Sequence, residues 1–203
     1  MGNINLETNT VALVGKVSTD FQYSHEVFGE GFYKFELAIE RTSNYVDYIP
    51  VMISERLVDV KKDLTGTYVY VSGSYRSFNL HEDNKSRLVL TVFAHEIETD
   101  VDYELTNNVM LTGYVCKAPV YRKTPLGREI TDLVLAVNRA YGKSDYIPCV
   151  CWGRTARFAS TFEVGTEVKL CGRIQSRAYQ KQISETEVED RIAYEVSVSK
   201  VEI

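Results

Sequence analysis

Flat aromatic rings and basic side chains alternate along the second half of the sequence. The set comprises the aromatic residues Tyr141, Tyr146, Trp152 and Tyr179 and the basic residues Arg122, Lys123, Arg128, Arg139, Lys143, Arg154, Arg173 and Arg177. A single nucleic-acid strand exposes the faces of its bases and a row of phosphates, so a binder that tolerates any sequence needs aromatic platforms between cations. The pattern therefore predicts a surface for single-stranded nucleic acid.

Trp152 is the one tryptophan of the chain, and a lone tryptophan is more often packed in a core than exposed to a ligand. Along its strand it has the parity opposite to Cys149 and Cys151, which suit a core face. Tyr146 lies six residues before Trp152 and shares its face. We expect both rings to face a ligand.

The sequence argues less strongly for a binding role of the other members of the set. Tyr141 and Tyr179 lie next to polar loop residues and are equally compatible with ordinary rim positions. Each arginine alone is compatible with an ordinary solvated surface position. Only the neighbouring aromatic rings suggest that these arginines bind a ligand. Arg173 has the parity opposite to Gly172 and Ile174, which directs it away from the expected core.

The elements that must position these residues occur twice in the chain. Segments of the first half recur 98 residues later: Val11-x-Leu13-x-Gly15-x-Val17 as Val109-x-Leu111-x-Gly113-x-Val115, Leu37 to Arg41 as Leu135 to Arg139, and Asp47-Tyr48-Ile49-Pro50 as Asp145-Tyr146-Ile147-Pro148. One offset over unequal gaps indicates two copies of a domain of about a hundred residues. We expect a first copy at residues 1–104 and a second copy at residues 105–203.

Strands explain both copies better than helices. Apolar residues alternate at a period of two over 109–115 and 133–137. The best helix candidate spans 154–162, with a counterpart over 56–64, and each ends shortly before a glycine. The order predicts an all-β chain of two tandem five-stranded OB-fold barrels, each with one short helix between strands 3 and 4.

Charge is divided unequally between the copies. The whole chain has a formal net charge of −5, which opposes binding to a polyanion. The first copy carries 9 Lys and Arg against 17 Asp and Glu, a net −8, whereas the second carries 14 against 11, a net +3. The asymmetry indicates different tasks and favours phosphate contact in the second copy.

Cysteine and histidine usage argues against a metal site. All four cysteines lie in the second copy, so we interpret them as reduced thiols packed as small hydrophobes. Cys149-x-Cys151 lacks a second pair at metal-ligand spacing, and the three histidines lie in the other copy. We expect no metal, no cofactor and, without a paired Ser/His/Asp arrangement or a phosphate-binding glycine loop, no enzyme.

The sequence also bears on compartment. No apolar run approaches the roughly 20 residues that a bilayer-spanning helix needs. The N-terminus lacks a basic segment followed by an apolar one. We therefore expect a cytoplasmic protein without a membrane partner.

The second copy resembles the bacterial single-stranded DNA-binding protein family. The stretches that carry the resemblance are Asn108 to Gly113, Thr124 to Gly127, Leu135 to Tyr141, Val150 to Arg154 and Gly172 to Tyr179. The first copy is similar more weakly, at 11–15, 37–41 and around Tyr48. The resemblance implies a tandem OB-fold relative that binds and protects single-stranded DNA, without sequence preference, in replication, recombination or repair. It also implies base stacking on Tyr141, Tyr146, Trp152 and Tyr179.

The first copy has lost most of these platforms. Ser43, Ser54 and Leu80 stand opposite Tyr141, Trp152 and Tyr179, so that only Tyr48 is retained. Other side chains leave a shifted strand path open: Tyr45, Tyr75 and Phe78, with Arg41 and Arg76. Because its net charge opposes phosphate, we expect the first copy to supply mainly assembly surface.

The resemblance bears on assembly and partners as well. It implies oligomers that present four OB domains, which two tandem chains would provide, so we expect a homodimer. Family members usually end in a flexible segment with an acidic tip that recruits other enzymes, whereas this sequence stops at Val201-Glu202-Ile203. We therefore expect no tail-mediated recruitment. The connection over 142–145 is shorter than is typical, which leaves the strand path open.

The sequence is compatible with two alternatives. The barrel could serve as a protein-interaction module, such as a primosome accessory or regulator, with weak or no binding of nucleic acid. A concave groove lined by Tyr146, Trp152 and arginines would favour nucleic acid, whereas a flat apolar patch would favour protein. Stacking and phosphate contacts serve RNA as well as DNA, so RNA is also a possible ligand.

Overall fold

The computed structural model describes residues 8–82, 85–183 and 188–203. In the first copy the strands are β1 (Asn9–Val17), β2 (Gln22–Val27), β3 (Glu30–Glu40), β4 (Val46–Ser54), β5 (Tyr68–Glu82) and β6 (Lys85–Thr99). In the second copy the elements are β7 (Asn107–Val115), β8 (Val120–Lys123), β9 (Glu129–Asn138), a 3-10 turn (Ala140–Gly142), β10 (Ser144–Trp152), α1 (Gly153–Ala159), β11 (Glu167–Gln182) and β12 (Val188–Glu202). The chain is all-β, as predicted.

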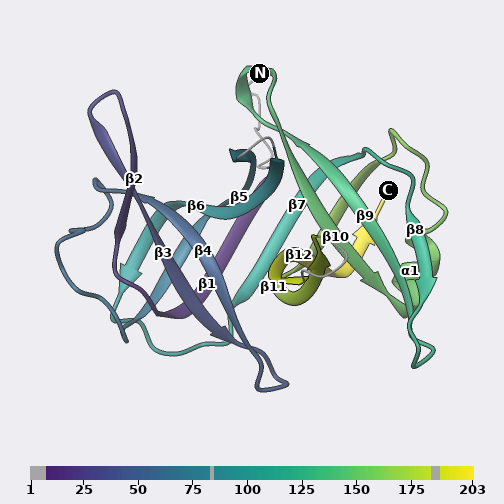
Figure 1. Cartoon of the computed structure of the whole chain (residues 1–203), viewed down its shortest axis with the longest axis horizontal. Coiled ribbons are helices and arrows are strands. Elements are labelled where there is room, and N and C mark those ends of the chain that lie inside the picture. Colours follow the sequence, from purple (N-terminus) through teal and green to yellow (C-terminus); the bar gives the residue numbers. More distant parts are fainter. Residues whose placement is uncertain (1–7, 83–84, 184–187) are drawn as a thin grey trace, which may run out of the picture.

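The strands form two barrels that lie side by side (Figure 1). The hydrogen-bonded order is β2-β3-β4-β6-β5-β1-β7-β11-β12-β10-β9-β8, which reads the same from both ends once equivalent strands are matched. Additional pairings of β3 with β1 and of β9 with β7 close each barrel. Five strands of each copy close the barrel. Among the described residues, the sixth strand, β2 or β8, pairs only with the strand that follows it. This closed five-stranded arrangement is the OB fold.

Strand register repeats between the copies as the sequence repeat predicts. Val71 pairs with Leu13 in the first copy, and Leu170 pairs with Leu111 in the second. Each copy also contains one parallel pairing, β4 with β6 and β10 with β12. The equivalent residues therefore occupy equivalent places, and the two copies can be compared position by position.

A glycine in each copy lets two strands cross closely. The pairing of β5 with β6 shifts register between Ser72 and Gly73, and that of β11 with β12 shifts between Cys171 and Gly172. A Cβ on Gly73 would collide with the carbonyl oxygen of Phe93, and one on Gly172 with that of Ser197. These bulges bend the long hairpins so that the barrels can close.

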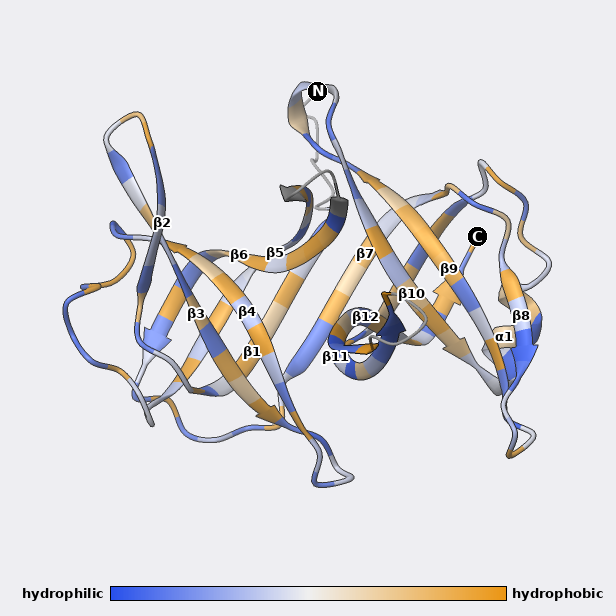
Figure 2. Cartoon of the chain, in the orientation of Figure 1, coloured by the Kyte–Doolittle hydropathy of each residue, from blue (hydrophilic) through white to orange (hydrophobic). Residues whose placement is uncertain are grey.

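Apolar alternation builds the core of each barrel. Orange apolar positions alternate with blue polar ones along the strands in Figure 2. Leu13, Leu37 and Ile49 are fully buried in the first copy, and Leu135 and Ile147 are fully buried in the second. One side of each strand thus faces the core, while the other side remains available for binding.

One local expectation was wrong. The segment over 56–64, expected to be a helix, forms turns, whereas its counterpart in the second copy contains α1. Asp59 and Asp63 accept backbone hydrogen bonds from Lys61 and Thr65, two residues further along each time. Such local bonds from Asp side chains compete with helical pairing, which explains the turns.

The copies are joined through their first strands. β1 pairs antiparallel with β7, centred on Val11 opposite Val109. Two further backbone bonds flank this ladder, from Val14 N to Thr106 O and from Thr112 N to Thr8 O, both 2.8 Å long. Each bond is the repeat equivalent of the other, so the interface between copies is approximately two-fold symmetric.

Candidate nucleic-acid interface

Strand β10 presents Trp152 at the surface of the second copy. Cys149 and Cys151, on the opposite parity, are 2% and 0% exposed, whereas Trp152 is 39% exposed. The exposure follows from the strand period of two, which directs alternate side chains to the core and to the solvent. The prediction that Trp152 faces outward is confirmed.

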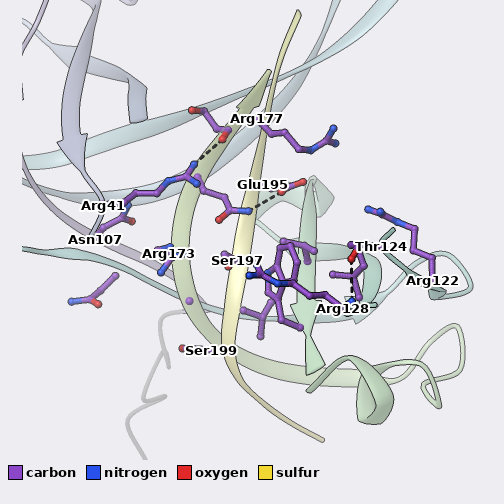
Figure 3. A pocket seen from close by; sticks show the side chains of 18 residues that line it. Arg41, Asn107, Arg122, Thr124, Arg128, Arg173, Arg177, Glu195, Ser197 and Ser199 are labelled. Atoms are coloured by element: carbon purple, nitrogen blue, oxygen red, sulfur yellow. Dashed lines mark hydrogen bonds between the residues drawn. The ribbon is translucent and has the colours of Figure 1, made fainter. Parts of the chain in front are cut away.

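Trp152 contributes to a groove with a volume of about 900 Å³. Other lining side chains come from β11 and β12, from the β8 to β9 hairpin and from the first copy. In Figure 3, Arg41 and Arg173 lie on one side of the yellow strand β12, and Arg122 and Arg128 lie on the other. The lining includes five arginines, Arg41, Arg122, Arg128, Arg173 and Arg177, against one carboxylate, Glu195.

The arginines differ in how far their charge is compensated. Arg122 binds Asp132 through two hydrogen bonds of 2.7 and 3.2 Å, which offsets its charge. Arg177 lies over the ring of Tyr179, 5.7 Å from its centroid. Among the described residues, Arg128 and Arg173 form no ion pair, so they retain full charge toward a ligand.

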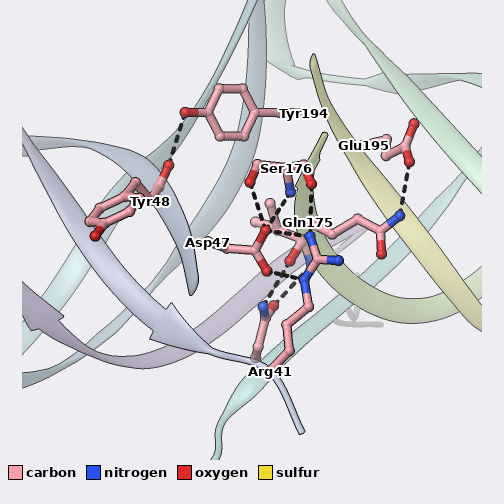
Figure 4. Close-up of polar contacts among 9 residues, drawn as sticks. Arg41, Asp47, Tyr48, Gln175, Ser176, Tyr194 and Glu195 are labelled. Carbon is pink, nitrogen blue, oxygen red and sulfur yellow. Dashed lines mark hydrogen bonds and ion pairs between the residues drawn. The ribbon is translucent and has the colours of Figure 1, made fainter. Parts of the chain in front are cut away.

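Arg41 reaches this groove from the first copy. Its guanidinium donates two hydrogen bonds of 2.6 Å to Asp47 and one of 2.7 Å to the carbonyl oxygen of Ser176 (Figure 4). The hydrogen bond to Asp47 raises the pKa of Arg41, the largest of several effects that include an opposing one from burial. Arg41 therefore remains a cation, fixed in place at the boundary between the copies.

Asp47 is the centre of this contact. Its carboxylate is fully buried and also accepts hydrogen bonds from the backbone N–H and the hydroxyl of Ser176, at 2.6 and 2.8 Å. The hydroxyl of Tyr194 donates to the carbonyl oxygen of Tyr48 at 2.9 Å, which is a further hydrogen bond across the copies. A buried carboxylate with every oxygen paired fixes the relative position of the two copies.

The repeat places a similar contact on the other side of the interface. Asp145 is fully buried, accepts a 2.7 Å bond from Ser77 N and forms a 3.1 Å bond with Arg76. The backbone N–H of Tyr146 donates to Ser77 Oγ at 2.7 Å. Arg139 Nε lies 3.3 Å from the Asp145 carboxylate but forms no hydrogen bond among the described residues. Arg139 is therefore held less tightly than Arg41.

The other predicted site residues occupy different places. Tyr141, Arg139 and Lys143 line a second cavity, the first-copy cavity, which lies against the first copy. Tyr179 lines a cavity that also includes Tyr194. The remaining side chains are exposed but lie outside the Trp152 groove: Tyr48, Tyr146, Lys123 and Arg154. The predicted set is therefore divided between surfaces, and the members in the groove are Trp152, Arg122, Arg128, Arg173 and Arg177.

Two residues of the first copy lie in surroundings other than those expected from the sequence. Arg41 was considered only for the first copy, yet it lines the groove of the second. Its signal in the sequence was the repeat of an arginine six residues before an aspartate, as Arg41 and Asp47 and again as Arg139 and Asp145. Tyr75, considered as an aromatic for a shifted strand path, is 1% exposed and cannot stack on a base.

Two of the four cysteines of the second copy, Cys149 and Cys151, are buried and packed as small apolar groups. Burial raises the pKa of Cys151 to about 12 and that of Cys149 well above its usual range. Both side chains are therefore neutral thiols at physiological pH. Over residues 8–82, 85–183 and 188–203, no group of three or more His, Cys, Asp or Glu side chains is arranged to hold a metal ion.

In the described part of the chain, no helix is long and apolar enough to cross a membrane.

Comparison with known sequences relates the second copy to a family of known proteins. The sequence model of the Single-strand binding protein family matches residues 106–203. Single-stranded DNA-binding protein B of Bacillus subtilis (strain 168) is 35% identical over 83 residues, which cover 37% of this chain and 74% of that protein. Single-stranded DNA-binding protein 2 of Listeria innocua is 36% identical over 95 residues, which cover 41% of this chain and 60% of that protein. The chain spans about half of Single-stranded DNA-binding protein A of Bacillus subtilis, 49%.

Comparison with solved structures covers both copies. The wild-type single-stranded DNA binding protein from Thermus aquaticus superimposes with a TM-score of 0.76 at 20% sequence identity, over 96% of this chain and 91% of that one. A deletion mutant of the same protein gives a TM-score of 0.75 at 21% identity. At this level of identity the likeness concerns the fold, which both barrels share. From its sequence relatives, this chain belongs to the single-strand binding protein family.

Proposed function

We propose that the second copy binds single-stranded DNA in the Trp152 groove, without sequence preference. The observation that carries the proposal is an exposed tryptophan in a groove of about 900 Å³ lined by five arginines and one carboxylate. Single strands expose base faces and phosphates, and this groove offers a partner for each. Relatives named as single-stranded DNA-binding proteins support DNA as the strand.

The two kinds of contact have separable contributions. A base stacked on Trp152 would stabilise the complex by about 1–3 kcal/mol. Arg128, Arg173 and Arg177, which form no ion pair among the described residues, would contact phosphates and displace counterions. With three phosphates neutralised, the logarithm of the binding constant should fall with the logarithm of salt concentration at a slope of about −2.

The experiment that tests the proposal uses the one tryptophan of the chain. The intact protein is titrated with a thymidine oligonucleotide at low and moderate salt while Trp152 fluorescence is recorded. We expect strong quenching whose midpoint moves to higher concentration as salt rises. Absence of quenching, together with absence of binding by a second method, would overturn the proposal.

The protein-interaction alternative is less well supported. Trp152 and the arginines line a concave groove rather than a flat apolar patch, which favours nucleic acid. The sequence criterion for nucleic acid was a concave groove lined by Tyr146, Trp152 and arginines. Tyr146 lies outside the groove, so this criterion is met in part. The single-strand binding protein family consists of DNA-binding proteins rather than enzymes, and we assign no catalysis to this member.

We also propose that residues 1–104 and 105–203 are two domains and that two chains form a homodimer with four OB domains. β6 ends at Thr99 and β7 begins at Asn107, which leaves a short connection at the proposed boundary. Sedimentation at micromolar concentration tests the assembly, with a mass near twice 23.1 kDa expected. A monomer would overturn the dimer and leave the proposed DNA binding unaffected.

A further inference from the structure

The sheet that runs through both copies ends in two edge strands, β2 and β8. The strand order places β2 at one end of the sheet and β8 at the other. Among the described residues, β2 forms backbone pairs only with β3, and β8 only with β9, so the outer N–H and C=O groups of each strand have no backbone partner. In Figure 1 the two strands lie at opposite ends of the long axis of the molecule. An exposed edge of this kind is a template for a strand of another chain.

Both edges expose large apolar side chains at equivalent positions of the repeat. Tyr23 is 62% exposed and Phe28 is fully exposed on the first hairpin, and 98 residues later Tyr121 is 40% and Leu126 86% exposed. Phe28 also has a φ of 51°, in the left-handed region that is costly for a residue with a side chain. Burial of these side chains against another chain would offset that cost.

The two hairpins carry opposite charge. Residues 20–33 contain three carboxylates and no Lys or Arg, a net −3, whereas the equivalent residues 118–131 contain three Lys and Arg against one carboxylate, a net +2. The charged residues are Asp20, Glu26 and Glu30 on the first hairpin and Arg122, Lys123, Arg128 and Glu129 on the second. Arg122 and Glu30 already form ion pairs within the chain. Glu26 and Lys123 are exposed and form no ion pair among the described residues, so their charges are available to a partner.

The signs of these charges determine which edges can pair. If β2 paired with β2 of another chain, carboxylates would meet carboxylates, and a pair of β8 strands would bring Lys123 close to other cations. Like charges on facing strands are destabilising, so both symmetric pairings are disfavoured. Pairing of β2 with β8 joins opposite charges instead, and the net charges of −8 and +3 on the two copies favour the same orientation. A contact between two different edges is heterologous and can continue from chain to chain.

We propose that chains of this protein associate end to end, with β2 of one chain paired to β8 of the next and Glu26 facing Lys123. The partner is a second copy of this chain, because only the chain itself is shown to carry both complementary edges. The contact goes beyond the proposed function, since it requires no nucleic acid. β2 has six residues and β8 has four, so the paired surface is small and the association is weak and dependent on concentration. It adds to the proposed homodimer and does not replace it.

Zero-length cross-linking of the intact protein tests the contact directly. Isotopically labelled and unlabelled protein are mixed at low salt and high protein concentration and treated with a carbodiimide, which joins a carboxylate to an amine that touches it. We expect a Glu26–Lys123 product in which one peptide is labelled and the other is not. Because β2 and β8 lie at opposite ends of one chain, this product reports a contact between two chains. Absence of the mixed product would overturn the inference.

A charge swap gives a second measurement, by light scattering of the protein without nucleic acid. The mean mass of the unmodified protein should rise above that of the dimer as its concentration increases at low salt, and this rise should shrink at high salt. Lys123→Glu should abolish the rise, because it places two carboxylates opposite each other. Glu26→Lys together with Lys123→Glu in one chain should restore the rise, since opposite charges then face each other again.

Lys181→Glu is the matched control for the charge swap. Lys181 is an exposed lysine of the same copy outside both hairpins, and its substitution changes the net charge by the same amount as Lys123→Glu. The control should keep the rise in mass. An equal loss in the control, or a rise that persists in Lys123→Glu, would overturn the inference. No rise and no cross-linked product in the unmodified protein would also overturn it and would favour a strand of a different protein as the occupant of these edges.

Discussion

The Trp152 groove and the first-copy cavity occupy equivalent places in two barrels of the same fold, yet they present different chemistry. The groove has one exposed indole and five arginines, whereas the cavity has phenylalanines and four cations of mixed type. Both are completed by an arginine from the opposite copy. The comparison shows that the two barrels share the scaffold and one arginine position, that of Arg41 and Arg139, whereas their aromatic lining residues lie on different strands.

The largest expected effect concerns the carboxylates that hold the two copies together. Asp47→Ala should lower the free energy of unfolding by about 3–5 kcal/mol, because it leaves Arg41 and the Ser176 N–H without their partner. Asp145→Ala should cost less, since Arg139 forms no hydrogen bond with Asp145. Urea denaturation measures both.

Asp132→Ala is the control for this prediction. Asp132 also accepts two hydrogen bonds from an arginine, Arg122, but both side chains are more than 40% exposed. Its loss should cost less than about 1 kcal/mol. Equal losses for Asp47→Ala and Asp132→Ala would contradict a special role for the contact between copies.

The next effect tests the Trp152 groove. Trp152→Ala should weaken binding of a short oligonucleotide about 5- to 150-fold, because it removes the indole platform. Fluorescence anisotropy of a labelled thymidine oligonucleotide measures the change. Tyr114→Ala is the control, since Tyr114 has the same 39% exposure in the same copy but lies outside the groove. A loss of similar size for the control would show that aromatic exposure alone accounts for the result.

A smaller expected effect, on the pH dependence of stability, distinguishes the core of the second copy from that of the first. Cys151 has a pKa raised to about 12 by burial, whereas its equivalent in the first copy, Ile53, does not titrate. Because the unfolded thiol ionises near pH 9 and the folded thiol does not, stability should fall between about pH 9 and pH 12. Cys151→Val should reduce that slope by up to about 1.4 kcal/mol per pH unit.

Thermal or urea unfolding at a series of alkaline pH values measures the slope. Below pH 9 both states keep the proton, so the difference in slope between Cys151→Val and the unmodified protein should vanish there. An unchanged slope in the variant above pH 9 would show that Cys151 does not contribute to it.

The smallest effect concerns the free cations of the Trp152 groove. Arg173→Gln should reduce the magnitude of the salt slope of binding by about 0.7, since one phosphate contact is lost. Arg122→Gln should change it less, because Asp132 already offsets that charge. Binding isotherms at several salt concentrations measure both slopes. The reverse order would contradict the assignment of Arg173 as a phosphate contact.

Much of the fold could be predicted from the sequence, and less of the binding surface. The parity argument placed Trp152 outside and Cys149 and Cys151 inside, because a strand alternates its side chains over adjacent residues. The helix expected over 56–64 was wrong, since Asp side chains there bond the local backbone. Residues 184–187, within the stretch where the repeat predicted an insertion, lie outside the described part of the chain.

The sequence by itself determined the repeat, the strand pattern and the division of charge between the copies. The strand pattern depends on residues near one another in the chain, and the repeat and the charge division follow from comparing two segments. None of the three requires knowledge of the fold. Only the tertiary structure decided that Arg41 serves the groove of the opposite copy and that Tyr141 faces the first-copy cavity. Hydrogen bonds such as that from Ser176 to Asp47 join residues 129 apart. Strand closure brings such pairs together, and local periodicity carries no information about them.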